Sequence, residues 1–157
     1  MAPTQSPSHG GSRTGSGQVP CRILLVDDQP YFLALARNLL APEGYEVQTA
    51  SSGAEALQAA PAGRPEIILL DVEMPGMDGF ETCRRLKANP STAGIPVVFL
   101  TASLDPKLKE RAFEAGAQAA YLKAISPDRL QAILRDVLTA ARARPRQAAS
   151  GVTLNRT

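Results

Sequence analysis

Three short stretches of the chain are continuously apolar, and each is followed by a polar or charged residue. They are Ile23–Val26, Ile67–Leu70 and Val97–Leu100. A continuous apolar run of this length is typical of a strand that is buried on both faces, as in a parallel sheet. Two further stretches, Tyr45–Thr49 and Ala119–Leu122, have the length and composition of shorter strands. The pattern therefore predicts five strands.

Between these strands, apolar side chains recur at the spacing of an α-helix. Pro30 suits the first turn of the first helix, and Ser52 suits the N-cap of the second, with Glu55 completing a capping box. The five predicted helices run from Pro30 to about Leu40, from Ser52 to Ala60, from about Gly79 to Leu86, from about Pro106 to Ala115, and from Pro127 to about Arg142.

Strands and helices alternate five times with short connections. This alternation predicts an α/β fold, a doubly wound, five-stranded parallel sheet with five helices on its two faces. Right-handed crossovers leave only a few strand orders, among them the flavodoxin-like order 2-1-3-4-5. We expect residues 21–142 to form this domain. Residues 1–20, rich in Gly, Ser, Pro and Thr, are expected to be a disordered N-terminal tail, and residues 143–157 a flexible C-terminal tail.

Composition and charge exclude several classes of protein. The 157 residues carry a formal net charge of +2, which gives no reason to expect nucleic-acid binding. No apolar run approaches the ~18 residues of a membrane span, and the N-terminus lacks the apolar core of a secretory signal, so we expect a cytoplasmic protein. Cys21 and Cys83 have no partner at metal-binding spacing and are expected to be thiols. His9, the only histidine, lies in the N-terminal tail.

The residues that follow the predicted strands are chemically unusual as a group. They are Asp27 and Asp28 after the first strand, Asp71 after the third, Thr101 after the fourth and Lys123 after the fifth. An aspartate alone at such a place can simply form a turn. Five polar residues at the same edge of a parallel sheet, where open α/β sheets bind their ligands, instead predict a functional site.

The three aspartates indicate a metal site. In the flavodoxin-like order the first and third strands are neighbours, so the three carboxylates would lie close together and repel one another. Mg²⁺ relieves such repulsion because it prefers carboxylate oxygens as ligands. One carboxylate can then act as a nucleophile in phosphoryl transfer, with Lys123 and Thr101 supplying positive charge and a hydrogen bond to the phosphoryl oxygens.

Four sequence blocks resemble the motifs of receiver domains of two-component response regulators. They are "ILLVDDQP", "IILLDVEMPGMDGFE", "IPVVFLTA" and "GAQAAYLKAISPDRL", and the resemblance covers residues 21–142. It implies that Asp71 is the phosphoacceptor and that Thr101 and Lys123 bind the phosphoryl group. It also implies that Asp28, Asp71 and the backbone carbonyl of Glu73 bind Mg²⁺, while Asp27 contributes through a water molecule.

The last block departs from the receiver pattern at two places. Receivers usually have a proline after the lysine, often in cis, and this chain has Ala124, so we expect a trans peptide there. The usual aromatic residue three positions before the lysine is Ala120, and Tyr121 follows one position later. Because strand side chains alternate between faces, Tyr121 should share the face of Lys123, unless a β-bulge near Ala119 restores the usual arrangement. The departures put signal propagation in doubt, not the chemistry of the site.

Three functions remain open at this stage. The leading hypothesis is a single-domain response regulator of the chemotaxis type, which accepts phosphate from a histidine kinase or a histidine phosphotransfer protein. It would not be an enzyme in its own right, and it would signal by binding a partner near the fourth helix and fifth strand. The last fifteen residues are too short for an output domain, so no direct DNA binding is expected. The alternatives are a phosphorylation-independent docking module and a small flavodoxin-like enzyme such as a phosphatase, which lacks support from a phosphate-binding loop.

Overall fold

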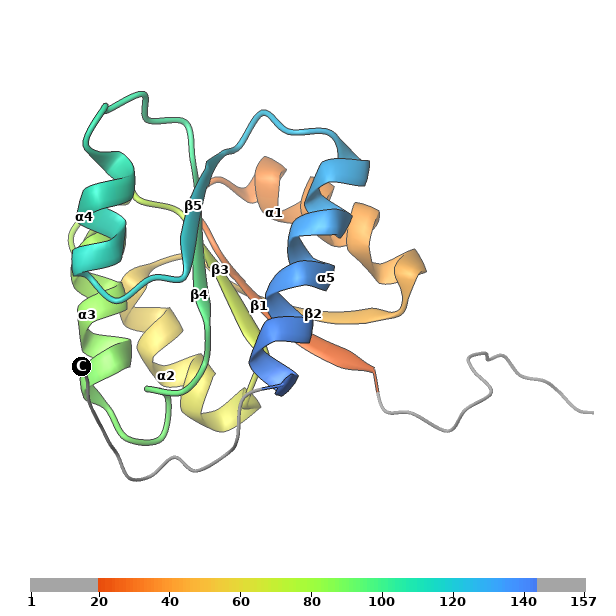
Figure 1. The fold of residues 1–157 in the computed structure, drawn as a ribbon, viewed down its shortest axis with the longest axis horizontal. Helices are drawn as coiled ribbons and strands as arrows, with labels where there is room; N and C mark the ends of the chain where they lie inside the picture. Colours follow the sequence, from red (N-terminus) through yellow and green to blue (C-terminus); the bar gives the residue numbers. More distant parts are fainter. Residues whose placement is uncertain (1–19, 144–157) are drawn as a thin grey trace, which may run out of the picture.

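The computed structural model describes residues 20–143, which form a five-stranded parallel sheet (Figure 1). The strands are β1 (Cys21–Val26), β2 (Tyr45–Ala50), β3 (Ile67–Leu70), β4 (Val97–Thr101) and β5 (Ala119–Leu122). They lie in the order β2-β1-β3-β4-β5. The predicted class, a doubly wound α/β sheet in the flavodoxin-like order, is therefore confirmed. Apart from Pro20 and Ala143, the predicted tails lie outside the described residues.

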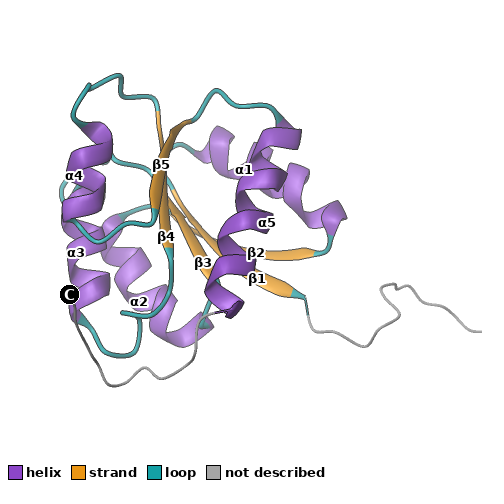
Figure 2. Ribbon diagram, viewed as in Figure 1, coloured by secondary structure: helices purple, strands orange, loops and turns teal. Residues whose placement is uncertain are grey.

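Helices cover both faces of this sheet. They are α1 (Pro30–Leu40), the 3-10 turn η1 (Ala41–Glu43), α2 (Gly53–Gly63), α3 (Gly79–Ala88), α4 (Leu108–Glu114) and α5 (Pro127–Ala143). Figure 2 shows α1 and α5 on one face and α2, α3 and α4 on the other. Along β1, Ile23 and Leu25 pack into the core under α1 and α5, whereas Leu24 and Val26 pack into the core under the other helices. Burial on both faces explains the continuous apolar runs.

The start of α2 matches the predicted capping box except for one hydrogen bond. Ser52 is the N-cap, and its Oγ accepts a hydrogen bond from the backbone N–H of Glu55 at 3.0 Å, as predicted. The Glu55 carboxylate, however, accepts from the backbone N–H of Ser51 at 2.7 Å rather than from that of Ser52. The side chain therefore caps the residue before the N-cap, and the capping box is only half formed.

Three predicted helix boundaries differ from the structure by two or three residues. Helix α3 ends at Ala88 rather than at Leu86. Helix α2 continues past Ala60 and through Pro61 to Gly63, and ends where Arg64 adopts a left-handed conformation and donates its N–H to the Ala60 carbonyl. Helix α4 begins at Leu108, not at Pro106, because Asp105 organises a turn first. The Asp105 carboxylate accepts from the N–H of Lys107 at 2.9 Å, and its carbonyl accepts from the N–H of Leu108 at 3.0 Å.

The loop after β3 passes close to the strand end. The N–H of Gly79 donates to the carbonyl of Val72 at 2.7 Å, and a Cβ at Gly79 would collide with the carbonyl oxygen of Asp71. Gly76 has a φ of +77°, in the left-handed region that favours glycine. The Asp78 carboxylate then caps α3 by accepting from the N–H of Glu81 at 2.9 Å. These residues hold the first turn of α3 directly against the end of β3.

Two expectations from composition concern the described residues. No helix within residues 20–143 is both long enough and apolar enough to span a membrane. Cys21 in β1 and Cys83 in α3 are both free thiols, as predicted. Burial raises the pKa of each thiol to about 11, so both remain protonated near neutral pH and are poor nucleophiles. His9 lies outside the described residues.

Candidate functional site

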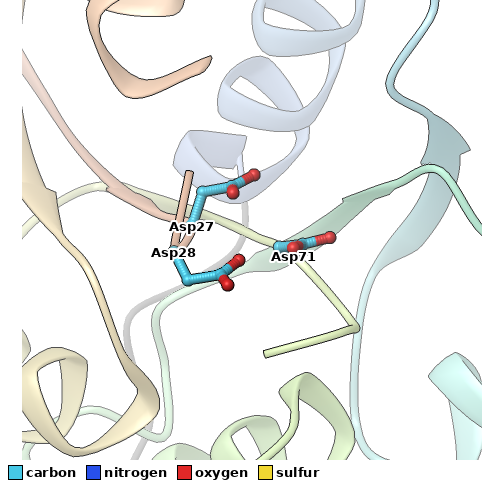
Figure 3. A group of neighbouring side chains, drawn as sticks. All are labelled: Asp27, Asp28 and Asp71. Atoms are coloured by element: carbon cyan, nitrogen blue, oxygen red, sulfur yellow. The ribbon is translucent and has the colours of Figure 1, made fainter. Parts of the chain in front are cut away.

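Three aspartates meet at the carboxyl ends of β1 and β3. Asp27 and Asp28 follow β1, Asp71 follows β3, and each offers a carboxylate oxygen within 4.8 Å of the others (Figure 3). The alignment of the strand ends brings them together, because the N–H of Asp71 donates to the Val26 carbonyl at 2.9 Å. Asp27 and Asp71 are almost fully buried, with 1% and 5% of their surfaces exposed. The predicted clustering of these three side chains is therefore present.

The electrostatic setting of Asp71 is unfavourable to its own charge. Burial raises the pKa of its carboxyl to about 6, and the negative charge of Asp27 adds to this shift, while the ammonium of Lys123 partly opposes it. A buried carboxylate beside like charges favours either a proton or a cation. The three oxygens are the type of ligand that a hard divalent cation such as Mg²⁺ prefers, so the donor set fits that ion.

Lys123, which follows β5, supplies positive charge to this cluster from the carboxyl end of that strand. Its Nζ lies 2.7 Å from Asp27 Oδ2 and 3.7 Å from Asp71 Oδ2. Asp27 Oδ2 is buried, and the Lys123 ammonium compensates its charge by forming an ion pair with it. The backbone N–H of Lys123 donates to the carbonyl of Thr101 at 2.8 Å, which fixes the end of β5 to the end of β4.

Thr101 ends β4 and its side chain is fully buried. Its Oγ1 accepts a hydrogen bond from the backbone N–H of Ser103 at 3.1 Å, so the hydroxyl proton remains available for another acceptor. Ser103 Oγ in turn accepts from the N–H of Asp105 at 3.2 Å. A short series of hydrogen bonds thus connects the Thr101 hydroxyl to the turn that precedes α4.

Glu73 lies two residues after Asp71 in the loop that follows β3, and it is exposed. With Ser103, Asp105 and Arg111 it lines a cavity of about 570 Å³ between this loop and α4. The assignment of its backbone carbonyl as a metal ligand stays a prediction.

The departures on β5 take the form that the sequence predicted. No peptide bond among the described residues is cis, so the bond before Ala124 is trans. The pairing of β4 with β5 runs without interruption from Val98 with Ala119 to Thr101 with Leu122, which excludes the β-bulge. Ala120 is buried under α4, whereas Tyr121 packs on the opposite face with α5, where the guanidinium of Arg129 lies 5.7 Å from its ring centroid.

Sequence reasoning missed two contacts within the site. Phe32, assigned only to the core stripe of the first helix, lies with its ring centroid 4.7 Å from Lys123 Nζ. Gln29 donates its backbone N–H to Asp27 Oδ1 at 2.9 Å. The contact of Gln29 with Asp27 had a local signal, because an aspartate commonly accepts a hydrogen bond from the N–H two residues later, whereas the contact of Phe32 with Lys123 had none.

Comparison with known proteins gives several similar sequences. The response regulator PleD of Caulobacter vibrioides is 45% identical over 116 residues, which are 74% of this chain and 26% of PleD. The gliding motility regulatory protein of Myxococcus xanthus is 41% identical over 102 residues, 65% of this chain and 13% of that protein. The DNA-binding response regulator MtrA of Mycolicibacterium smegmatis is 37% identical over 114 residues, 73% and 49% of the two chains. The chain therefore spans half or less of these relatives.

Solved structures of similar fold and a comparison with protein families point to the same family. Chemotaxis protein CheY4 of Vibrio cholerae superposes with a TM-score of 0.72 at 32% identity, covering 75% of this chain and 98% of that one. A CheY-like response regulator receiver domain protein of Methanospirillum hungatei superposes with a TM-score of 0.73 at 26% identity, covering 78% and 97%. Residues 23–135 match the family described as the response regulator receiver domain. With its sheet order and its three clustered aspartates, this chain belongs to the response regulator receiver domain family.

Proposed function

We propose that Asp71 accepts a phosphoryl group in a two-component phosphorelay, and that phosphorylation changes the affinity of the domain for an output partner. The observation that carries the proposal is the position of Asp71, which is buried at the end of β3 beside two other carboxylates and within 3.7 Å of an ammonium group. A carboxylate held in this way lowers the stability of the fold, and groups perturbed in this way are concentrated at functional sites.

In the proposed transfer, an Asp71 carboxylate oxygen attacks phosphorus in line with the leaving group. One P–O bond forms to Asp71, and the P–N bond to the donor histidine breaks, or the P–O bond to acetate when acetyl phosphate is the donor. The electron pair of the broken bond goes to the leaving group. Lys123 neutralises charge on the phosphoryl oxygens, and the Thr101 hydroxyl donates a hydrogen bond to one of them.

We assign Mg²⁺ binding to four residues. Asp28 and Asp71 bind Mg²⁺ through their carboxylates and Glu73 through its backbone carbonyl, while Asp27 acts through a water molecule. When bound, Mg²⁺ neutralises part of the negative charge of the transferring phosphoryl group. The close approach of Asp27 to Lys123 supports the indirect role of Asp27, because both of its oxygens already have partners in the protein.

The proposed partners are of two kinds. A histidine kinase or a histidine phosphotransfer protein donates the phosphoryl group. The output partner binds the surface of α4 and β5, which exposes 76% of Phe113 and 42% of Leu122. A hollow of about 250 Å³ in this surface is lined by Ala112, Phe113 and Ala120 among others. We expect neither direct DNA binding nor a catalytic cycle on a separate substrate. The chain acts as a phosphoacceptor that assists its own phosphorylation and dephosphorylation.

Intact mass spectrometry after incubation with acetyl phosphate tests the proposal. We expect one phosphoryl group per chain, dependent on Mg²⁺, stable in acid and labile in base. Asp71→Asn should abolish it, and the matched control Asp105→Asn should keep it, because Asp105 lies in the neighbouring loop outside the acidic cluster. Persistence of the adduct in Asp71→Asn would remove Asp71 as the acceptor. Absence of any adduct in the wild type, together with partner binding unaffected by phosphodonor, would favour the docking module instead.

A further inference from the structure

The ammonium group of Lys123 is enclosed by two carboxylates and an aromatic ring. Its Nζ lies 2.7 Å from Asp27, 3.7 Å from Asp71 and 4.7 Å from the centroid of the Phe32 ring. The Lys123 side chain is 15% exposed, compared with 51% for Arg111, whose guanidinium lies over the ring of Phe80. Because attraction between a cation and a ring grows as the cation is withdrawn from water, the Phe32 contact has the stronger physical basis.

An aromatic ring holds a cation without acting as a directed acceptor. The ammonium group has three N–H donors, and the ring attracts the positive charge as a whole through the negative face of its π-system. The donors that face the carboxylates therefore remain available to Asp27 and to oxygens bound at Asp71. A carboxylate or amide at position 32 would instead compete for a donor and draw the ammonium away from the reacting group.

The backbone fixes Phe32 relative to Asp27. Gln29 donates its N–H to Asp27 Oδ1 at 2.9 Å, and the N–H of Leu33 donates to the Gln29 carbonyl at 3.1 Å. The first turn of α1 is thus attached to the same carboxylate that pairs with Lys123. The Phe32 backbone and the Asp27 carboxylate are therefore held by the same turn, and both side chains approach the ammonium group of Lys123 after β5.

We propose that Phe32 is a positioning residue, whose ring holds the Lys123 ammonium where it can neutralise the phosphoryl group on Asp71. This role rests on the proposed phosphorylation of Asp71. It is distinct from core packing, to which Phe32 also contributes together with Leu33. A packing role depends on the volume and shape of the side chain, whereas the positioning role depends on the electron density of the ring face.

Fluorinated phenylalanines separate these two roles. Replacing Phe32 with analogues that carry one, two and three ring fluorines lowers the negative potential of the ring face with little change in shape. We expect the rate of phosphorylation by acetyl phosphate at saturating Mg²⁺ to fall in steps along this series. Phe32→Leu should slow the reaction about fivefold, which corresponds to about 1 kcal/mol, and Phe32→Tyr should stay within about twofold of wild type. Leu33→Ala, the matched control, should lower thermal stability without slowing the reaction.

Proton NMR reports on the contact without any phosphodonor. The ε-methylene protons of Lys123 should show an upfield ring-current shift that is present in Phe32→Tyr and lost in Phe32→Leu, but unchanged in Leu33→Ala. A reaction rate that is constant along the fluorine series, or an unshifted methylene signal in the wild type, would overturn the positioning role while leaving phosphorylation of Asp71 intact. If the wild type took up no phosphoryl group at all, the proposed function would fail and this inference with it.

Discussion

Two regions of this domain are built very differently. One lies at the carboxyl ends of β1 and β3, and the other is the surface formed by α4 and β5. At the first place, buried charges lie within a few ångströms of one another, with a carboxylate ion pair of 2.7 Å and a raised pKa at Asp71. At the second, the strand presents Ala120 where related receivers have an aromatic residue, and a hollow of about 250 Å³ lies beside it. The proposed acceptor site keeps the carboxylates, the lysine and the threonine of the receiver pattern, whereas the surface proposed to transmit the signal departs from that pattern at Ala120.

This difference separates two parts of receiver function. The proposed acceptance of a phosphoryl group depends on charged and hydroxyl side chains at the strand ends, and Asp71, Lys123 and Thr101 lie there. Transmission through an aromatic side chain on β5 depends on a ring that can turn inward, and the small side chain of Ala120 offers no such ring. For the proposed signal, the described residues contain a continuous series of hydrogen bonds that runs from Thr101 through Ser103 to the Asp105 turn before α4.

The largest expected effect concerns the metal at the acceptor site. Asp28→Ala should weaken Mg²⁺ binding by about a hundredfold, because it removes a direct ligand, whereas Asp27→Ala should weaken it by about tenfold, as expected for a residue that acts through water. Isothermal titration calorimetry measures both. Equal and negligible losses in the two variants would contradict the assignment of ligands.

A smaller effect concerns the stability of the metal-free protein. The pKa of Asp71 is raised from 3.8 to about 6 in the folded state, so the native protein binds this proton more tightly than the unfolded chain does. The resulting cost to stability is absent below the unfolded value and complete once the pH has risen through about 6. Without Mg²⁺ at about pH 8, Asp71→Asn should therefore raise the free energy of unfolding by about 1 kcal/mol.

Urea denaturation over a range of pH tests this effect. The gain in Asp71→Asn should shrink as the pH falls below about 6, and it should also shrink at saturating Mg²⁺. The isosteric control Asp105→Asn should show neither trend. If Asp71→Asn is no more stable than wild type at high pH, the ionised Asp71 carboxylate does not lower the free energy of unfolding.

The smallest expected effect concerns Tyr121 on β5, in the second of the two regions. Tyr121 packs with α5 beside Arg129, on the face of β5 opposite Ala120, although the residue also borders the hollow near α4. We therefore expect the NMR shifts that beryllofluoride induces with Mg²⁺ along α4 to persist in Tyr121→Ala. If the wild type shows large shifts along α4 and β5 and Tyr121→Ala abolishes them, the usual aromatic switch operates in this protein.

Periodicity and residue type were sufficient to predict the fold and the acidic cluster. The apolar runs before Asp27 and Asp71 indicated strands buried on both faces, and parallel strands bring their carboxyl ends to one edge. Strict alternation along β5 also predicted the facing of Tyr121 correctly. These features could be predicted because the strands and the facing of their side chains depend on residues that are close in the sequence.

Features that depend on distant or competing contacts were not predictable in the same way. Helix α2 tolerates Pro61 and ends only where Arg64 takes up a left-handed conformation. Helix α4 starts two residues after the predicted position, because the side chain of Asp105 forms a turn in place of the first helical turn. Phe32 lies near Lys123 only because α1 and β5 approach one another in space, and the sequence spacing of the two residues carries no trace of that contact.

The site of phosphorylation can be read directly by reducing the acyl phosphate. Borohydride converts a phosphorylated aspartate to homoserine, and peptide mass mapping then identifies the modified position. After treatment with acetyl phosphate and Mg²⁺, we predict homoserine at position 71, and none when Mg²⁺ is removed by chelation. Homoserine at position 27 or 28 instead, or at no position in a sample whose intact mass carries the phosphoryl group, would contradict the central claim that Asp71 is the phosphoacceptor.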